Sequence, residues 1–180
     1  MHFIQELDFL YEVSDYNIAG HVLPIRSISR VVYVFGSRVE HEIEFITETT
    51  GQTTLLPQHV VAKLQEIDSR AQTILWESGH YNAVAQMPVI LIPVVFDVDT
   101  VDPNYAGRQH SVVLRPFITN DFMTGIFHFR YTRCTPTRKC KFATLVFTIL
   151  DMVSAITEVG GVSRVVYDLT CKPPGTTEWE

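Results

Sequence analysis

The chain contains the same five-residue word, SRVVY, twice, at residues 29–33 and 163–167. Both copies are rich in β-branched and aromatic residues and have glycine close by, so each predicts a β-strand. Helical patterns lie between the two copies. The repeat therefore favours a duplicated α+β unit. The alternative is that RVVY is simply a good strand composition that occurs twice.

The second copy leads directly into a proline-containing tail. Residues 163–170 read SRVVYDLT, and residues 171–180 read CKPPGTTEWE. Pro173 and Pro174 fix their own φ angles and bias the residues before them away from helix. We expect a stiff, extended tail that holds Lys172 and the final TTEWE at a set distance from the strand. Such an arrangement suits residues that must reach another molecule.

The first half of the chain shows both helix and strand periodicities. Residues 3–13 place apolar side chains on one helical face and predict a short amphipathic helix. Over 42–48, Ile43, Phe45 and Thr47 are set against Glu42, Glu44 and Glu48, a pattern typical of a half-solvated strand. The clearest helix begins near Pro57 and ends at Gly79. Its predicted apolar stripe comprises Val60, Leu64, Ile67, Ala71 and Ile74.

The second half repeats this alternation of strands and helices. The apolar run 87–96 predicts a buried strand with Pro93 at a bulge or edge, and 111–119 predicts another strand. A helical stripe over 146–156 ends at a Gly-Gly pair before the terminal strand. The predicted class is α+β, with one mixed or antiparallel sheet and helices packed on one face. A duplicated unit would make two halves of this fold related.

Composition restricts the compartment and the partners. The three cysteines are odd in number and widely spaced, so neither a disulfide framework nor a CxxC motif is expected. The first residues are acidic where a signal peptide is basic, and no apolar run reaches transmembrane length. We expect a cytosolic protein without a membrane partner. A net charge of −6 disfavours a general nucleic-acid binder.

One segment has the opposite charge. Residues 127–150 contain five basic residues and no acidic one, with Phe127, Phe129 and Tyr131 interleaved. Such a segment could bind an anionic single strand by charge and stacking. The alternatives are a solvated loop or a stretch of wrongly joined coding sequence.

Motifs for catalysis and metal binding are missing from the sequence. Asp97, Asp99 and Asp102 lack the glycine and glutamate spacing of a calcium loop, so a solvated turn is the expected structure. The seven histidines show no zinc spacing, and no phosphate-binding glycine motif occurs. We therefore predict no catalytic residue and no metal ligand in this chain.

Four segments carry a resemblance to a known family. They are SRVVYVFG from residue 29, AQMPVIL from 85, SVVLRPFITNDFMTGI from 111 and GVSRVVYDLTCKPPGTTEWE from 161. Together they resemble the C-terminal domain of glutamine-hydrolysing GMP synthase, in its eukaryotic form. The resemblance implies a domain over 22–180, with 1–21 as a poorly matched segment. Residues 127–148 depart from the family pattern and form an atypical basic insert or a mis-spliced stretch.

The resemblance also implies a function and a set of site residues. Enzymes of this family are carbon–nitrogen ligases that use glutamine, ATP and Mg²⁺ to convert xanthosine monophosphate (XMP) to GMP in purine biosynthesis. Their C-terminal domain helps to bind XMP and forms the dimer in bacterial members. By position, Gln86, Lys172 and Glu178 match residues that bind XMP. Nothing here resembles the glutaminase or ATP-pyrophosphatase domains, so the chain alone is expected to bind no ATP or Mg²⁺ and to make no GMP.

Two other interpretations remain open from the sequence. Gln86 could cap the strand that follows it, while Lys172 and Glu178 could form an ion pair with each other. The chain could then be a stand-alone interaction or dimerisation module without a ligand.

Overall fold

A computed structural model describes residues 2–4, 30–39, 43–45, 57–96, 109–118, 126–127 and 141–170. Its centre is a five-stranded mixed sheet in the order β1-β2-β9-β6-β4. The strands are β1 (His2–Ile4), β2 (Val31–Val34), β4 (Val89–Ile92), β6 (His110–Leu114) and β9 (Val162–Asp168). β2 pairs antiparallel with β9, β6 pairs parallel with β9, and β4 pairs antiparallel with β6.

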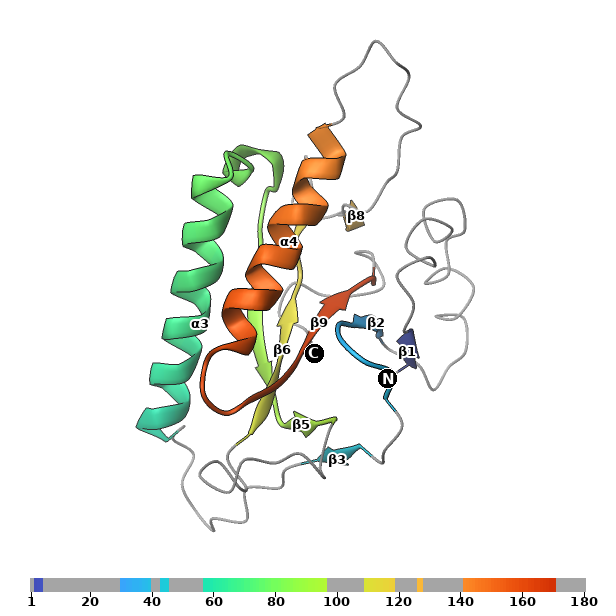
Figure 1. Ribbon diagram of the computed structural model, residues 1–180, viewed down its shortest axis with the longest axis vertical. Helices are drawn as coiled ribbons and strands as arrows, with labels where there is room; N and C mark the ends of the chain where they lie inside the picture. Colours follow the sequence, from blue (N-terminus) through green and yellow to red (C-terminus); the bar gives the residue numbers. More distant parts are fainter. Residues whose placement is uncertain are drawn as a thin grey trace.

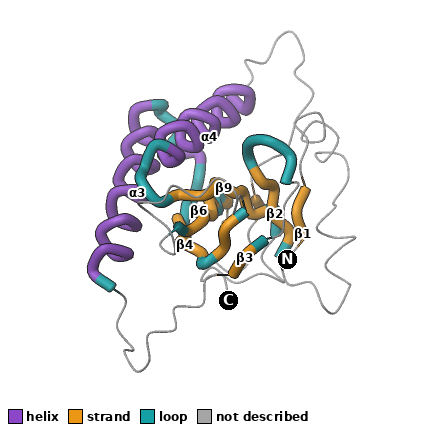
Figure 2. The backbone as a smooth tube through the Cα atoms, turned by 60° about the horizontal axis from the view of Figure 1, so that its bottom comes forward, coloured by secondary structure: helices purple, strands orange, loops and turns teal. Residues whose placement is uncertain are grey.

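Two helices cover one face of this sheet. They are α3 (Gln58–Glu77) and α4 (Lys141–Thr157), and both views place them side by side over the strands (Figures 1 and 2). Because α4 follows β6 and precedes the parallel strand β9, these three elements form a βαβ crossover. The prediction of an α+β fold with helices on one face is confirmed. The relation between two halves stays a prediction.

Alternation along the strands builds a core on each face of the sheet. Val31, Tyr33 and Phe35 point to the helices, where they pack with Ile67 and Met152. The intervening side chains belong to a second buried cluster on the opposite face, whose members include Val32, Val34, Val113, Val166 and Phe96. Successive residues of a strand point to opposite faces, so both faces of these strands are buried.

The two SRVVY copies lie next to each other. In the antiparallel pair β2–β9, Tyr33 is in register with Tyr167, and Val34 with Val166. Both predicted strands are confirmed. The first strand ends at Val34, and Gly36, two residues later, has a φ of +101°, which is strained for residues with a side chain.

The long helix follows its predicted stop signal closely. α3 ends at Glu77, and Gly79 follows the cap residue at φ +75°. There the Gly79 N–H donates to the Trp76 carbonyl at 3.0 Å, and the His80 N–H donates to the Leu75 carbonyl at 3.2 Å. These two bonds form a Schellman motif, which satisfies carbonyls at the helix end. Val60, Ile67 and Ala71 of the predicted stripe are buried, together with Leu75.

Proline divides the predicted long strands. The run 87–96 forms β4 and then β5 (Val94–Val95), separated at the exposed Pro93, and β4 is an edge strand of the sheet. β5 pairs with β3 (Glu44–Phe45) in a separate two-stranded sheet. Likewise β6 ends before Pro116, and β7 (Phe117–Ile118) pairs with β8 (Ile126–Phe127). Proline cannot donate a hydrogen bond to a neighbouring strand, which explains these breaks.

Two sequence predictions need correction. The expected helix over 3–13 is wrong for Phe3 and Ile4, because they pair parallel with β2 as part of β1; residues 5–13 lie outside the described residues. In addition, α4 begins at Lys141, five residues before the helical stripe predicted over 146–156. Tertiary pairing of β1 overrides a weak local helical pattern.

Candidate functional site

Polar residues from four strands converge at one end of the sheet. β6 and β9 end there, whereas β2 and β4 begin there, as their pairing directions require. The N–H of Arg115, just after β6, donates to the carbonyl of Pro88, just before β4, at 3.1 Å. This bond places Arg115 beside the segment that contains Gln86.

A buried ion cluster lies at the same end. The Asp168 carboxylate accepts hydrogen bonds from the guanidinium groups of Arg115 and Arg30, the latter at 3.4 Å between Nη1 and Oδ2. The exposed fractions are 4% for Arg30, 2% for Arg115 and 0% for Asp168. Such deep burial of charges requires ion pairing. We call Arg30, Arg115, Asp168 and Thr170 the Asp168 cluster.

Burial is the largest cause of the pKa shifts of Arg30 and of the neighbouring Tyr167. It lowers the pKa of Arg30 from its usual value; the Asp168 carboxylate opposes this change, and the neighbouring Arg115 charge adds to it. Burial also raises the pKa of Tyr167, and the adjacent Asp168 charge raises it further. The end of β9 therefore combines a buried carboxylate, a neutral phenol and two guanidinium groups.

Thr170 fixes the course of the chain after β9. Its N–H donates to Asp168 Oδ1 at 2.8 Å, and its hydroxyl accepts from the Val31 N–H at 3.0 Å. The Leu169 N–H donates to the Val31 carbonyl at 2.9 Å. A carboxylate that accepts the N–H two residues onward forms an Asx turn. The direction of the chain at Thr170 is thus set by side-chain hydrogen bonds as well as by strand pairing.

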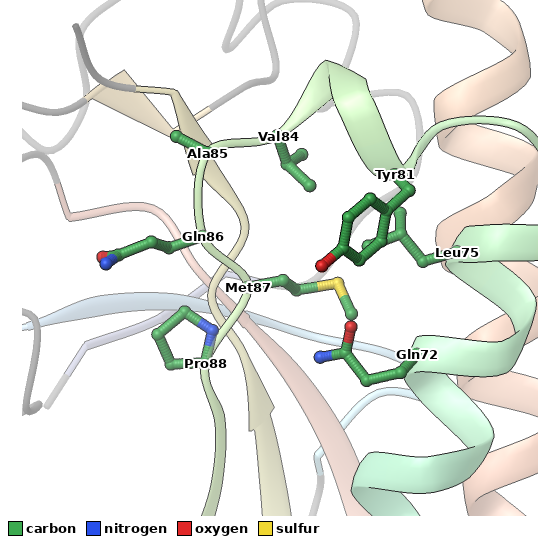
Figure 3. A pocket seen from close by; sticks show the side chains of 8 residues that line it. All are labelled: Gln72, Leu75, Tyr81, Val84, Ala85, Gln86, Met87 and Pro88. Atoms are coloured by element: carbon green, nitrogen blue, oxygen red, sulfur yellow. The ribbon is translucent and has the colours of Figure 1, made fainter.

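Gln86 lines a hollow of about 380 Å³ between the end of α3 and the entry to β4. The other lining residues are Gln72, Leu75, Tyr81, Val84, Ala85, Met87 and Pro88. In the close-up, the Tyr81 hydroxyl points towards Met87 and Gln72, whereas the Gln86 amide points to the other side of the chain (Figure 3). The Gln86 side chain is half-buried.

The structure describes one of the three predicted site residues. Gln86 lies at the sheet end described above, and Lys172 and Glu178 lie outside the described residues. So do Asp97, Asp99 and Asp102. Within the described ranges, no three His, Cys, Asp or Glu side chains gather as metal ligands, and no helix is long and apolar enough to span a membrane.

Sequence reasoning missed the Asp168 cluster. A signal was present: each residue directly follows a short apolar run, Arg115 in VVLRP and Asp168 in RVVYDL. A charged residue next to such a strand becomes buried when the surrounding elements cover it. The contacts between these residues could not be read from the sequence, since Arg115 is 53 positions and Arg30 is 138 positions from Asp168.

Comparison with known proteins identifies the family. Residues 73–179 match the model described as the GMP synthase C terminal domain. Probable GMP synthase [glutamine-hydrolyzing] of Caenorhabditis elegans is 43% identical over 166 residues, which cover 85% of this chain and 20% of that protein. GMP synthase [glutamine-hydrolyzing] of Dictyostelium discoideum is 32% identical over 174 residues, covering 91% and 21%, respectively.

The chain therefore spans about a fifth of the length of these curated relatives. The matched range includes Gln86, Lys172 and Glu178 as well as Arg115, Asp168 and Thr170, while Arg30 lies before it. The domain boundary expected at residue 22 stays a prediction. The chain belongs to the GMP synthase C-terminal domain family.

Proposed function

We propose that this chain is the part of a GMP synthase that binds XMP, and that Gln86, Lys172 and Glu178 contact the nucleotide. The lysine ammonium suits a phosphate oxygen, the glutamate accepts from ribose hydroxyls or base N–H groups, and the amide can do both. In this proposal the amination of XMP uses ATP, Mg²⁺ and glutamine bound by other domains. This chain binds the substrate and forms a homodimer contact. The enzyme acts in the cytosol and has no membrane or nucleic-acid partner.

The observation that carries the proposal is the convergence at one end of the sheet. Gln86 is two residues from Pro88, whose carbonyl accepts from the Arg115 N–H. The Arg115 side chain contacts Asp168, four residues before Lys172 in the sequence. Lys172 follows Thr170, the last residue that the structure describes, by two positions in the sequence. The segment that contains Gln86 and the strand end that leads towards Lys172 in the sequence therefore lie at the same end of the sheet, which supports assigning both residues to one site.

Calorimetric titration of the chain with XMP tests this proposal. We expect saturable binding that Lys172→Ala weakens about tenfold or more, because a hydrogen bond to a charged group contributes roughly 1.5–3 kcal/mol. Lys139→Ala is the matched control, since it removes the same charge from the basic segment. Absence of binding, or an equal loss in both variants, would contradict the assignment.

A further inference from the structure

β4 is an outer strand of the described sheet, and the hydrogen bonds on its inner side show which of its residues face outwards. The Arg115 N–H donates to the Pro88 carbonyl at 3.1 Å, so these two residues are a hydrogen-bonded pair. In an antiparallel ladder such pairs alternate with non-bonded pairs. The register of β4 with β6 therefore directs the N–H and C=O groups of Val89 and Leu91 away from β6. Among the described residues, no strand pairs with this outer side.

A helix and a hollow accompany this outer edge. α3 packs against β4, which lies on the side of the sheet nearer to that helix (Figure 2). The side chains of Val89 and Leu91 are half-buried against the core on the helix side. The hollow of about 380 Å³ lies between the end of α3 and Pro88, the residue directly before β4 (Figure 3). A segment that ran along the edge would therefore meet the hollow at one end.

The sequence of β4 does not prevent such pairing. Edge strands are commonly protected by charged side chains, but β4 reads VILI and contains none. Pro88 and Pro93 flank these four residues. Because proline cannot donate a backbone hydrogen bond, the two prolines limit any added pairing to the short stretch between them. The edge therefore suits a short extended segment rather than a long strand.

We propose that β4 binds an extended peptide segment of a partner protein by β-strand addition, with an apolar or aromatic side chain of that segment in the hollow. The outward N–H and C=O groups of Val89 and Leu91 pair with the peptide backbone, and the hollow selects a side chain. Leu75 and Met87 give the hollow an apolar wall. The Tyr81 ring is supported by an edge-on contact with Trp76, at 5.2 Å between the ring centroids.

Charge indicates the kind of peptide. None of the described residues that line the hollow is charged, but one of them, Gln72, donates from Nε2 to Asp68 Oδ1 at 3.4 Å. Residues four positions apart lie on the same side of a helix, so Asp68 lies one turn from the hollow. A basic side chain near the anchor residue matches this carboxylate. A second copy of β4 offers no such cation, because PVILIP over 88–93 is uncharged.

Amide hydrogen exchange of single residues, measured by NMR on the 180-residue chain, tests the edge. Ile90 and Ile92 bond to β6, so their amides should exchange about tenfold or more slowly than those of Val89 and Leu91. The probe is the peptide acetyl-Val-Lys-Val-Thr-Val-Phe-amide. At saturation it should slow exchange at Val89 and Leu91 by about threefold or more. Protection of these two amides without peptide, or no change with it, would overturn the proposal.

Proline substitution separates the two sides of the strand. Leu91→Pro removes an outward N–H and leaves the bonds to β6 in place, whereas Ile90→Pro removes a bond to β6. Leu91→Ala is the matched control, since it removes the side chain but keeps the N–H. In calorimetric titration with the peptide, Leu91→Pro should bind about tenfold more weakly than Leu91→Ala. Equal affinities, or a Leu91→Pro chain that unfolds as readily as Ile90→Pro, would overturn the proposal.

Two further measurements test the occupant. Asp68→Asn should weaken binding of the peptide about threefold, as expected for a solvent-exposed ion pair, but should not change binding of the same peptide with glutamine in place of lysine. An equal loss with both peptides would refute the role of charge. Sedimentation tests self-association: if the parent chain dimerises and Leu91→Pro is monomeric, the occupant is a second copy and the peptide proposal is overturned. None of these measurements involves XMP, so this proposal and the proposed function fail separately.

Discussion

Arg30 and Arg164 occupy the same place in the two copies of SRVVY but have different environments. Arg30 is 4% exposed and pairs with Asp168. Arg164 is half-buried, and its guanidinium donates to the carbonyls of Phe35 and Ser37, both at 3.0 Å, and to the Ser37 hydroxyl at 2.9 Å. Because β2 and β9 are antiparallel, the two arginines lie at opposite ends of the strand pair.

The difference shows that the arginine of the same five-residue segment has a different structural role in each copy. At one end of the pair, the arginine neutralises a buried carboxylate beside the exit to the C-terminal tail. At the other end, the arginine supports the turn that follows β2 by hydrogen bonds to backbone carbonyls. A word of identical sequence thus specifies the strand, while the neighbours that pairing brings to each end decide the role of the arginine.

The largest expected effect comes from removing the carboxylate at the buried end. Asp168→Ala leaves the guanidinium groups of Arg30 and Arg115 without this carboxylate, which should lower the free energy of unfolding by about 3–5 kcal/mol. Arg164→Ala, at the other end, should cost about 1 kcal/mol, because its hydrogen bonds are partly solvent-exposed and water can replace them. Urea denaturation of both variants measures the difference. Equal losses would mean that the two ends are energetically equivalent.

A smaller effect is expected at the turn that Arg164 supports. Gly36 has φ +101°, and a Cβ at this position would collide with the Arg164 guanidinium. Gly36→Ala should therefore cost about 2 kcal/mol through backbone strain and displacement of Arg164. Gly79→Ala is the control: its φ is +75° but nothing lies within 4 Å of the added Cβ, so it should cost about 1 kcal/mol. If Gly36→Ala lost no more free energy of unfolding than Gly79→Ala, a collision between the added Cβ and Arg164 would be excluded.

The smallest effect distinguishes the two tyrosines that face each other in the strand pair. Burial raises the pKa of Tyr33, and burial together with the Asp168 charge raises that of Tyr167. Above pH 10 the unfolded chain ionises these phenols to a greater extent than the folded chain does, so stability must fall as the pH rises. The expected contribution of Tyr167 is a fall of about 1.4 kcal/mol per pH unit.

Urea denaturation between pH 9 and pH 11 tests this asymmetry. Tyr167→Phe should make the alkaline fall in stability shallower, and Tyr33→Phe should do so to a lesser degree. If the free energy of unfolding of Tyr167→Phe fell with pH as steeply as that of the parent, Tyr167 would not be the source of the alkaline loss of stability.

The sequence predicted the elements better than their bounds. The apolar stripe and Gly79 located α3, and the SRVVY word located β2 and β9, because these signals depend on residues close in the chain. The prediction of an N-terminal helix was wrong at Phe3 and Ile4, because pairing with β2 decides the conformation of these residues. Of the candidate site, family resemblance supplied Gln86, Lys172 and Glu178, and only Gln86 lies in the described part of the chain.

By itself, the sequence determined the α+β class, the helix over 58–77 and the strands of the repeated word, because helix and strand periodicities are local. Tertiary structure alone decided that the two copies pair antiparallel and that Arg30, Arg115 and Asp168 meet. These contacts join residues 53 and 138 positions apart, and they form only because strand pairing and helix packing exclude water around the charges.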